Sequence, residues 1–336
     1  MDDSLFGSRD KRGQWTPHKR PSRAPLFVWP AQPKKFFVWM FGFPGYLWPW
    51  NTLLMGISVV TWVYLTPAMD TMRELSSGWA AILLRNATLA ILVYGGLHTL
   101  LYIYRRQGTN FKYNSKWPDT DNSVFLFRSQ TADNAFRTMC SGVPVWTAYE
   151  LLAWWAYSNG HITQVNIQEH PIYLVALILV APAWSSLHFY LIHRLIHIGP
   201  LYHIIHKVHH NSVNPGPWSG LSMHTFEHII YFSGVLFYFV VPSHPMNVMF
   251  FLMLQALQPA LGHLGFHKVV AGRDNHLDYD NYYHYLHHRY FEVNYTDTLI
   301  PFDEWFGTSH DGSPEADEAM YKRMKAKKFK RGGSKT

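Results

Sequence analysis

The sequence predicts an all-α, polytopic membrane protein with about four to six membrane helices and a histidine-rich helical cap on the cytoplasmic side. Long uncharged runs, basic ends and clustered histidines point to this fold. Apolar residues make up 48% of the 336 residues, and charged residues make up 15% against a typical ~25%. This composition excludes a disordered chain, a coiled coil and collagen. The lone Cys140 excludes a disulfide scaffold and an iron–sulfur centre.

The first uncharged run covers residues 36–69 and is broken by Pro44 and Pro49. We therefore expect a membrane helix over residues 51–65, because proline interrupts helices. Trp48, Trp50 and Trp62 are typical of interface anchoring.

Four further segments are apolar enough to be considered as spans. Residues 86–104 and 171–193 are uncharged and close to the ~20 residues that a span needs. Residues 143–157 are shorter and contain Glu150, so they could cross the membrane or re-enter it. Residues 229–262 are uncharged and cut by prolines, which predicts a helical hairpin with its turn near His244.

The charge pattern predicts the topology. Lys and Arg collect in a flexible basic arm (1–35), in the loop 105–137 and in a basic tail (313–336). The arm and the tail flank a membrane-embedded domain (36–312), which contains the loop. The positive-inside rule then places both termini and the histidine clusters on the cytoplasmic side, in a bacterial inner membrane or the endoplasmic reticulum. The acidic start argues against a signal peptide, and the missing motifs argue against nucleic-acid binding.

Histidine is the unusual residue, because 16 of the 21 histidines lie between His188 and His288. Four clusters occur, two of the form HxxxH and two of the form HxxHH. Spacings of three and four place side chains on one face of a helix. The candidate metal ligands are His193, His197, His206, His209, His210, His263, His267, His284, His287 and His288.

Ten imidazoles exceed the four to six ligands of one ion, so the clusters indicate two metal ions. Imidazole suits zinc, iron, copper and nickel. A structural zinc site of the cysteine type is excluded because it needs thiolates. Further side chains could orient the ligands through hydrogen bonds, although each has an ordinary structural explanation as well. These candidates are His188, His203, His224, Glu227, His228 and Asp280.

The stretch from Trp184 to Gly312 resembles the sterol desaturase and fatty acid hydroxylase superfamily. The ordered histidine boxes carry the resemblance, and the segments YFEVNY (290–295) and FDEWFGT (302–308) extend it toward sterol C5-desaturases. One departure is His224-Thr-Phe-Glu227, where the family often has His-Pro-x-Glu.

The resemblance implies a centre of two iron ions that uses O₂ to hydroxylate or desaturate a C–H bond of a sterol or fatty-acyl lipid. It implies no catalytic side chain beyond the metal ligands. The sequence has no GxGxxG dinucleotide motif and no haem motif. We therefore expect electrons from a partner such as cytochrome b5 or a ferredoxin with its reductase.

Two other functions are open at this point. A histidine-rich metal transporter would place its ionisable side chains within the bilayer, whereas these clusters fall at or beyond the ends of the spans. A zinc-dependent lipid hydrolase would usually add a carboxylate ligand, and the sequence has no HExxH string.

Overall fold

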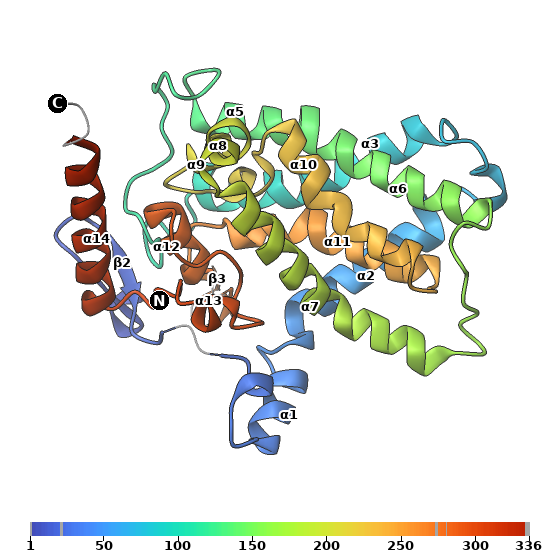
Figure 1. The fold of residues 1–336 in the computed structure, drawn as a ribbon, viewed down its shortest axis with the longest axis horizontal. Helices are drawn as coiled ribbons and strands as arrows, with labels where there is room; N and C mark the ends of the chain where they lie inside the picture. Colours follow the sequence, from blue (N-terminus) through green and yellow to red (C-terminus); the bar gives the residue numbers. More distant parts are fainter. Residues whose placement is uncertain (1, 21–22, 273–274, 280, 333–336) are drawn as a thin grey trace.

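The computed structural model describes residues 2–20, 23–272, 275–279 and 281–332, and it is mostly helical (Figure 1). The helices are α1 (Pro33–Phe41), α2 (Thr52–Leu65), α3 (Trp79–Ala90), α4 (Gly96–His98), α5 (Gln130–Arg137), α6 (Val143–Ser158), α7 (Pro171–Ile196), α8 (Gly199–Leu201), α9 (Lys207–His210), α10 (Thr225–Phe232), α11 (Pro245–Gly262), α12 (Tyr282–Tyr290), α13 (Phe302–Trp305) and α14 (Pro314–Gly332). Two short antiparallel hairpins, which the sequence did not suggest, join β1 (Gly7–Arg9) to β2 (Trp15–Pro17) and β3 (Lys268–Ala271) to β4 (Asn275–Asp278). The prediction of a helical fold is confirmed.

Two helical segments among the described residues are long and apolar enough to cross a membrane, Trp79–Ile103 and Pro171–Ile196. The first joins α3 and α4 through π-helical turns, and the second is α7. The predicted spans 86–104 and 171–193 lie within these two segments, apart from one residue at the end of the first. The larger number of four to six spans and the cytoplasmic side of the histidines stay predictions.

The third predicted segment, residues 143–157, is the greater part of α6, which continues α5 through a π-helical turn. Its Glu150 is fully buried and forms an ion pair with Arg85 of α3. Asn86 Nδ2 and Trp154 Nε1 also donate to the carboxylate, over 3.0 and 2.9 Å. The charge that interrupts the apolar run is therefore neutralised and hydrogen-bonded inside the bundle.

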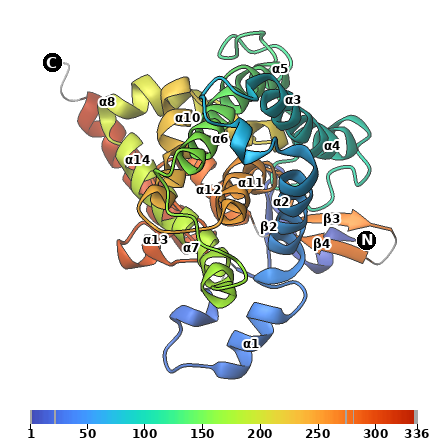
Figure 2. The ribbon, with the colours of Figure 1, turned by 90° about the vertical axis from the view of Figure 1, so that its right-hand side faces the viewer.

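The predicted hairpin 229–262 turns at His244, whose side chain caps the start of α11. Its first arm is α10 followed by a 3-10 segment, Ser233–Phe239. Figure 2 shows α11 at the centre of the bundle with α2, α6 and α7 around it. Most side chains of α11 are buried, so its lack of charge reflects packing inside the protein.

The N-terminal segment is not wholly the flexible arm that the sequence predicts. β1 and β2 pair, and Trp15 is 1% exposed. Its ring centroid lies 5.8 Å from that of Phe111 and 5.4 Å from that of His267. Burying a large aromatic side chain outweighs the disorder that a polar, proline-rich composition favours.

The two ends of the chain meet near the histidine-bearing helix α12. Trp15, Phe111, Tyr285 and Met320 belong to one buried apolar cluster. This cluster joins the N-terminal hairpin, the basic loop 105–137, α12 and α14 at one end of the molecule, on the left of Figure 1. α14 lies in the segment predicted as the basic tail, 313–336.

Candidate metal centre

The structure gathers nine of the ten predicted ligands into two groups. Within each group the potential ligand atoms all lie within 4.8 Å of one another. Group one consists of His193, His197, His206, His210 and His287, and group two consists of His209, His263, His284 and His288. Seven of these nine side chains are buried, and His197 and His284 are half-buried.

The HxxHH spacing divides each motif between the two groups. His206 and His210 are four residues apart and enter group one, whereas His209 between them enters group two. The second motif does the reverse, because the middle histidine, His287, enters group one. A residue at i+3 lies about 100° around the helix axis from a residue at i+4, so one helical turn can supply both groups.

The distances fit the coordination of one ion per group. The Nε2 atoms of His193 and His206 are 3.0 Å apart. The Nε2 atom of His263 lies 3.0 Å from that of His288 and 2.9 Å from that of His284. Two nitrogens bound at right angles to an ion, each about 2.1 Å from it, are separated by about 3 Å. The residues present therefore fit two metal ions.

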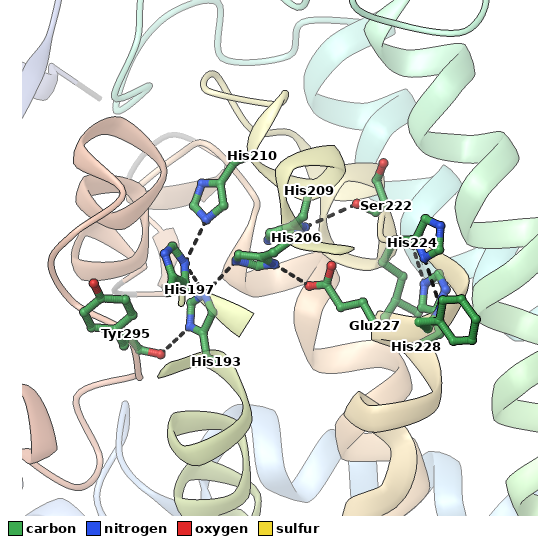
Figure 3. A network of polar contacts seen from close by, with 12 residues as sticks. His193, His197, His206, His209, His210, Ser222, His224, Glu227, His228 and Tyr295 are labelled. Carbon is green, nitrogen blue, oxygen red and sulfur yellow. Dashed lines mark hydrogen bonds and ion pairs between the residues drawn. The ribbon is translucent and has the colours of Figure 1, made fainter. Parts of the chain in front are cut away.

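Hydrogen bonds behind the rings set which nitrogen faces each group. His193 Nδ1 donates to the carbonyl of Tyr295 over 2.5 Å, as Figure 3 shows, and His287 Nδ1 donates to that of Val293 over 2.6 Å. His263 and His209 use the carbonyls of Pro259 and Ser222. A carbonyl can only accept, so Nδ1 carries the proton and Nε2 keeps its lone pair for a metal.

The loop that follows α12 supplies two of these carbonyls, a role that the sequence reasoning missed. Phe291 and Asn294 adopt left-handed backbone conformations with φ of 64° and 55°. The Asn294 side chain donates to the carbonyls of Tyr283 and His310, which fixes the loop. Asparagine tolerates this backbone region better than most residues, so an Asn soon after the last box was the available signal.

Glu227, predicted to orient an imidazole, contacts His206, a member of group one. His206 Nδ1 donates to Glu227 Oε1 over 2.7 Å (Figure 3). His224 caps α10 by accepting from the backbone of Phe226. His228 bonds to Ser141 and to the carbonyl of Leu221.

The remaining candidates lie elsewhere. His188 bonds to Ser233, and His203 is exposed beside Tyr202. Asp280 lies outside the described residues. None of His188, His203, His224 and His228 belongs to either group.

His267 lies apart from both groups, because the helix ends before it. α11 ends at Gly262, and Gly265 has a φ of 75°. A Cβ atom at Gly265 would lie 2.4 Å from the hydroxyl of Tyr102, so only glycine fits there. His267 instead approaches the Tyr113 hydroxyl, 3.1 Å from its Nδ1.

Burial keeps the imidazoles neutral. Loss of solvent lowers the pKa of His206 and of His284 to about 3 and that of His209 to about 4. It also lowers the pKa of His287 and His288, helped by neighbouring histidines. The neutral ring is the form that binds a metal.

A cavity borders both groups and gives them access to a ligand. The imidazoles that line it are His206, His209, His263 and His284. Phe189, Met223 and Tyr231 form apolar parts of its wall. An apolar cavity with a few polar groups is typical of a site for a small, largely apolar ligand.

Residues 175–308, which hold all nine grouped histidines, match the sequence profile of the fatty acid hydroxylase family. The chain is similar to that family over this segment, which is less than half of its length. The predicted resemblance to the sterol desaturase and fatty acid hydroxylase superfamily is thus confirmed. The fatty acid hydroxylase domain comprises α7 to α13, apart from the first residues of α7.

Curated relatives of the domain include sterol-modifying enzymes. A Delta(7)-sterol-C5(6)-desaturase of Nicotiana tabacum is 28% identical over 255 residues, which is 72% of this chain and 86% of the relative. A Delta(7)-sterol 5(6)-desaturase of Gibberella zeae is 27% identical over 47% of this chain and 50% of its own length. A C-4 methylsterol oxidase of Schizosaccharomyces pombe is 31% identical over 33% of this chain and 39% of its own length. No solved structure matches the chain.

Proposed function

We propose that this protein is an O₂-dependent, membrane-bound, non-haem di-iron oxidoreductase that hydroxylates or desaturates a C–H bond of a lipid of the sterol or fatty-acyl type. Its broader description, a lipid-modifying oxidoreductase, is supported by the family match and by the names of the relatives. The observation that carries the proposal is the pair of all-imidazole groups on one cavity.

Group one would hold one iron and group two the other. Two irons bound in this way supply the activation of O₂ and the removal of hydrogen from an unactivated C–H bond. The protein contributes geometry. Backbone carbonyls and the Glu227 carboxylate hold imidazole rings in place by accepting hydrogen bonds from their Nδ1 atoms. The ring of Phe189 stacks on His193 with centroids 4.7 Å apart. Rings that are held in place before binding lose little entropy when the metal binds.

The cavity would place a carbon atom of the lipid beside the imidazoles. Its wall near the metal centre is partly apolar, and a bound lipid there would displace water from the reacting carbon. We propose that the protein is an integral membrane protein with the histidine boxes and both termini in the cytoplasm, so that the lipid need not leave the bilayer. The two electrons needed for each O₂ would come from cytochrome b5 or from a ferredoxin with its reductase.

The alternatives have less support. A transporter needs ionisable side chains along a path through the bilayer, whereas nine imidazoles gather here in two compact groups. A zinc hydrolase usually includes a carboxylate ligand. Neither group contains a carboxylate among the described residues.

The proposal is tested with the iron-loaded protein in lipid nanodiscs, supplied with ferredoxin, reductase, NADPH and O₂. A Δ7-sterol and a fatty-acyl lipid serve as probes. We expect O₂ uptake that depends on one of these lipids, and a product that has gained one oxygen or lost two hydrogens. The His288→Ala variant should abolish both. Lipid hydrolysis without O₂, or transport of metal into sealed vesicles, would contradict the proposal.

A further inference from the structure

The cavity has a polar end away from the imidazoles. Ser186 and Asp297 line it together. Ser186 lies on α7 seven residues before His193, a separation of about 10 Å along the helix axis. Asp297 follows the carbonyl of Tyr295 that holds His193. α7 and the loop beside it therefore connect the metal centre to this second polar position.

Asp297 is held firmly on one oxygen only. Its Oδ1 accepts from Ser186 Oγ over 2.5 Å and from the backbone N–H of Leu299 over 2.9 Å. Its Oδ2 accepts no hydrogen bond from any described residue. The side chain is exposed because it faces open space at the cavity, yet surrounding protein atoms raise the pKa of the carboxyl. An acceptor oxygen that lines a cavity and has no partner among the described residues can accept a hydrogen bond from a ligand that brings a donor.

The residues around Asp297 show which end of the cavity is polar. Tyr283, Asp297 and Thr298 line both this cavity and an outer pocket. The outer pocket also contains the ion pair of Arg23 and Glu304. A ligand that reaches the imidazoles with its apolar part would therefore leave its polar end beside Asp297.

We infer that Asp297, positioned by Ser186, binds the hydroxyl group of a lipid alcohol. This inference rests on the proposed function and narrows its substrate class. A hydroxyl brings one donor for Oδ2 and offers its own oxygen to a donor such as the Thr298 hydroxyl, whereas an ammonium brings three donors and no acceptor. A free fatty acid or a phosphate would be repelled by the carboxylate.

The test compares binding of cholest-7-en-3β-ol and its 3-methyl ether to the iron-loaded protein in nanodiscs. The ether keeps the oxygen but has no donor. We expect the wild type to bind the alcohol about tenfold more tightly or better, the loss typical of one hydrogen bond to a charged group. Asp297→Asn should abolish this preference, because its amide N–H can donate to either oxygen. Glu304→Gln, which changes only the outer pocket, should retain it.

The outcomes separate this inference from the proposed function. Equal binding of alcohol and ether by the wild type overturns the inference, and so does an unchanged preference in Asp297→Asn. Tighter binding of the 3-amino analogue overturns the assignment to a hydroxyl. If Asp297→Asn does not fold, Ser186→Ala must lower the preference for the inference to stand. A preference that depends on Asp297, without oxidation of either probe, upholds the inference while contradicting the proposed reaction on this sterol.

Discussion

The Nδ1 atom of His206 lies 2.7 Å from Oε1 of Glu227, and the second carboxylate oxygen of Glu227 is buried with no hydrogen-bond partner among the described residues. His206 belongs to group one and also lines the cavity. The carboxylate therefore orients an imidazole that faces both the proposed metal and the proposed substrate.

We expect Glu227→Ala to weaken metal binding by about 10- to 100-fold, because partners of this kind fix the orientation and basicity of a ligand. Glu227→Gln keeps an acceptor and should have a smaller effect. Competition with a chelator measures the affinity. His224→Ala is the matched control, since His224 lies three residues earlier and in neither group. Equal affinity in Glu227→Ala and wild type would refute the orienting role.

A second prediction separates His267 from the histidines of the two groups. His287→Ala should remove one Nε2 atom from group one and lower the metal content. His267→Ala should leave the metal content unchanged and cost about 1 kcal/mol of stability for a lost hydrogen bond. Metal analysis of both purified variants, with an unfolding curve for each, tests this. Loss of metal in His267→Ala would show that it is a ligand.

The ligand set shows what the sequence could predict. The HxxHH strings indicated helical faces, and the structure brings all six of their histidines into the two groups. His263 and His267 are also four residues apart, as are His206 and His210, but they do not lie on one continuous helix. Gly265 adopts a left-handed conformation there, so the two side chains diverge. A spacing of four predicts a shared face only while the helix continues.

The apolar runs were less informative about helix ends. The second uncharged run begins at residue 86 because Arg85 precedes it, whereas the helical segment that contains this run begins at Trp79. Glu150 made the next segment ambiguous for the same reason. Arg85 and Glu150 lie 65 residues apart in the sequence and neutralise one another in the structure. The pattern of residues within one segment cannot predict a pairing with another segment.

We therefore predict that Arg85→Ala destabilises the protein by about 3–5 kcal/mol, the cost of leaving one partner of a buried ion pair alone. Replacing both partners, as Arg85→Met with Glu150→Leu, should recover most of that loss. Denaturant unfolding of the detergent-solubilised protein measures both variants. A double variant as unstable as the single one would show that the pair acts through its other hydrogen bonds instead.

Acid should destabilise the metal-free protein. Burial lowers the pKa of His206 and His284 from 6.5 to about 3, so the unfolded chain binds protons that the folded chain does not. The contribution of these two histidines to stability should be constant above about pH 7 and fall below pH 6.5, with up to about 1.4 kcal/mol lost per histidine and pH unit. Unfolding free energies from pH 8 to pH 5 test this, and equal values throughout would contradict it.

The number and kind of metal ions bound by each chain test the central claim most directly. The protein is expressed in iron-supplied cells, purified without chelator and analysed for all transition metals against its concentration from amino-acid analysis. We predict two irons per chain, falling to one or fewer in His287→Ala and in His288→Ala. A single ion per chain, or stoichiometric zinc in place of iron, would contradict the account.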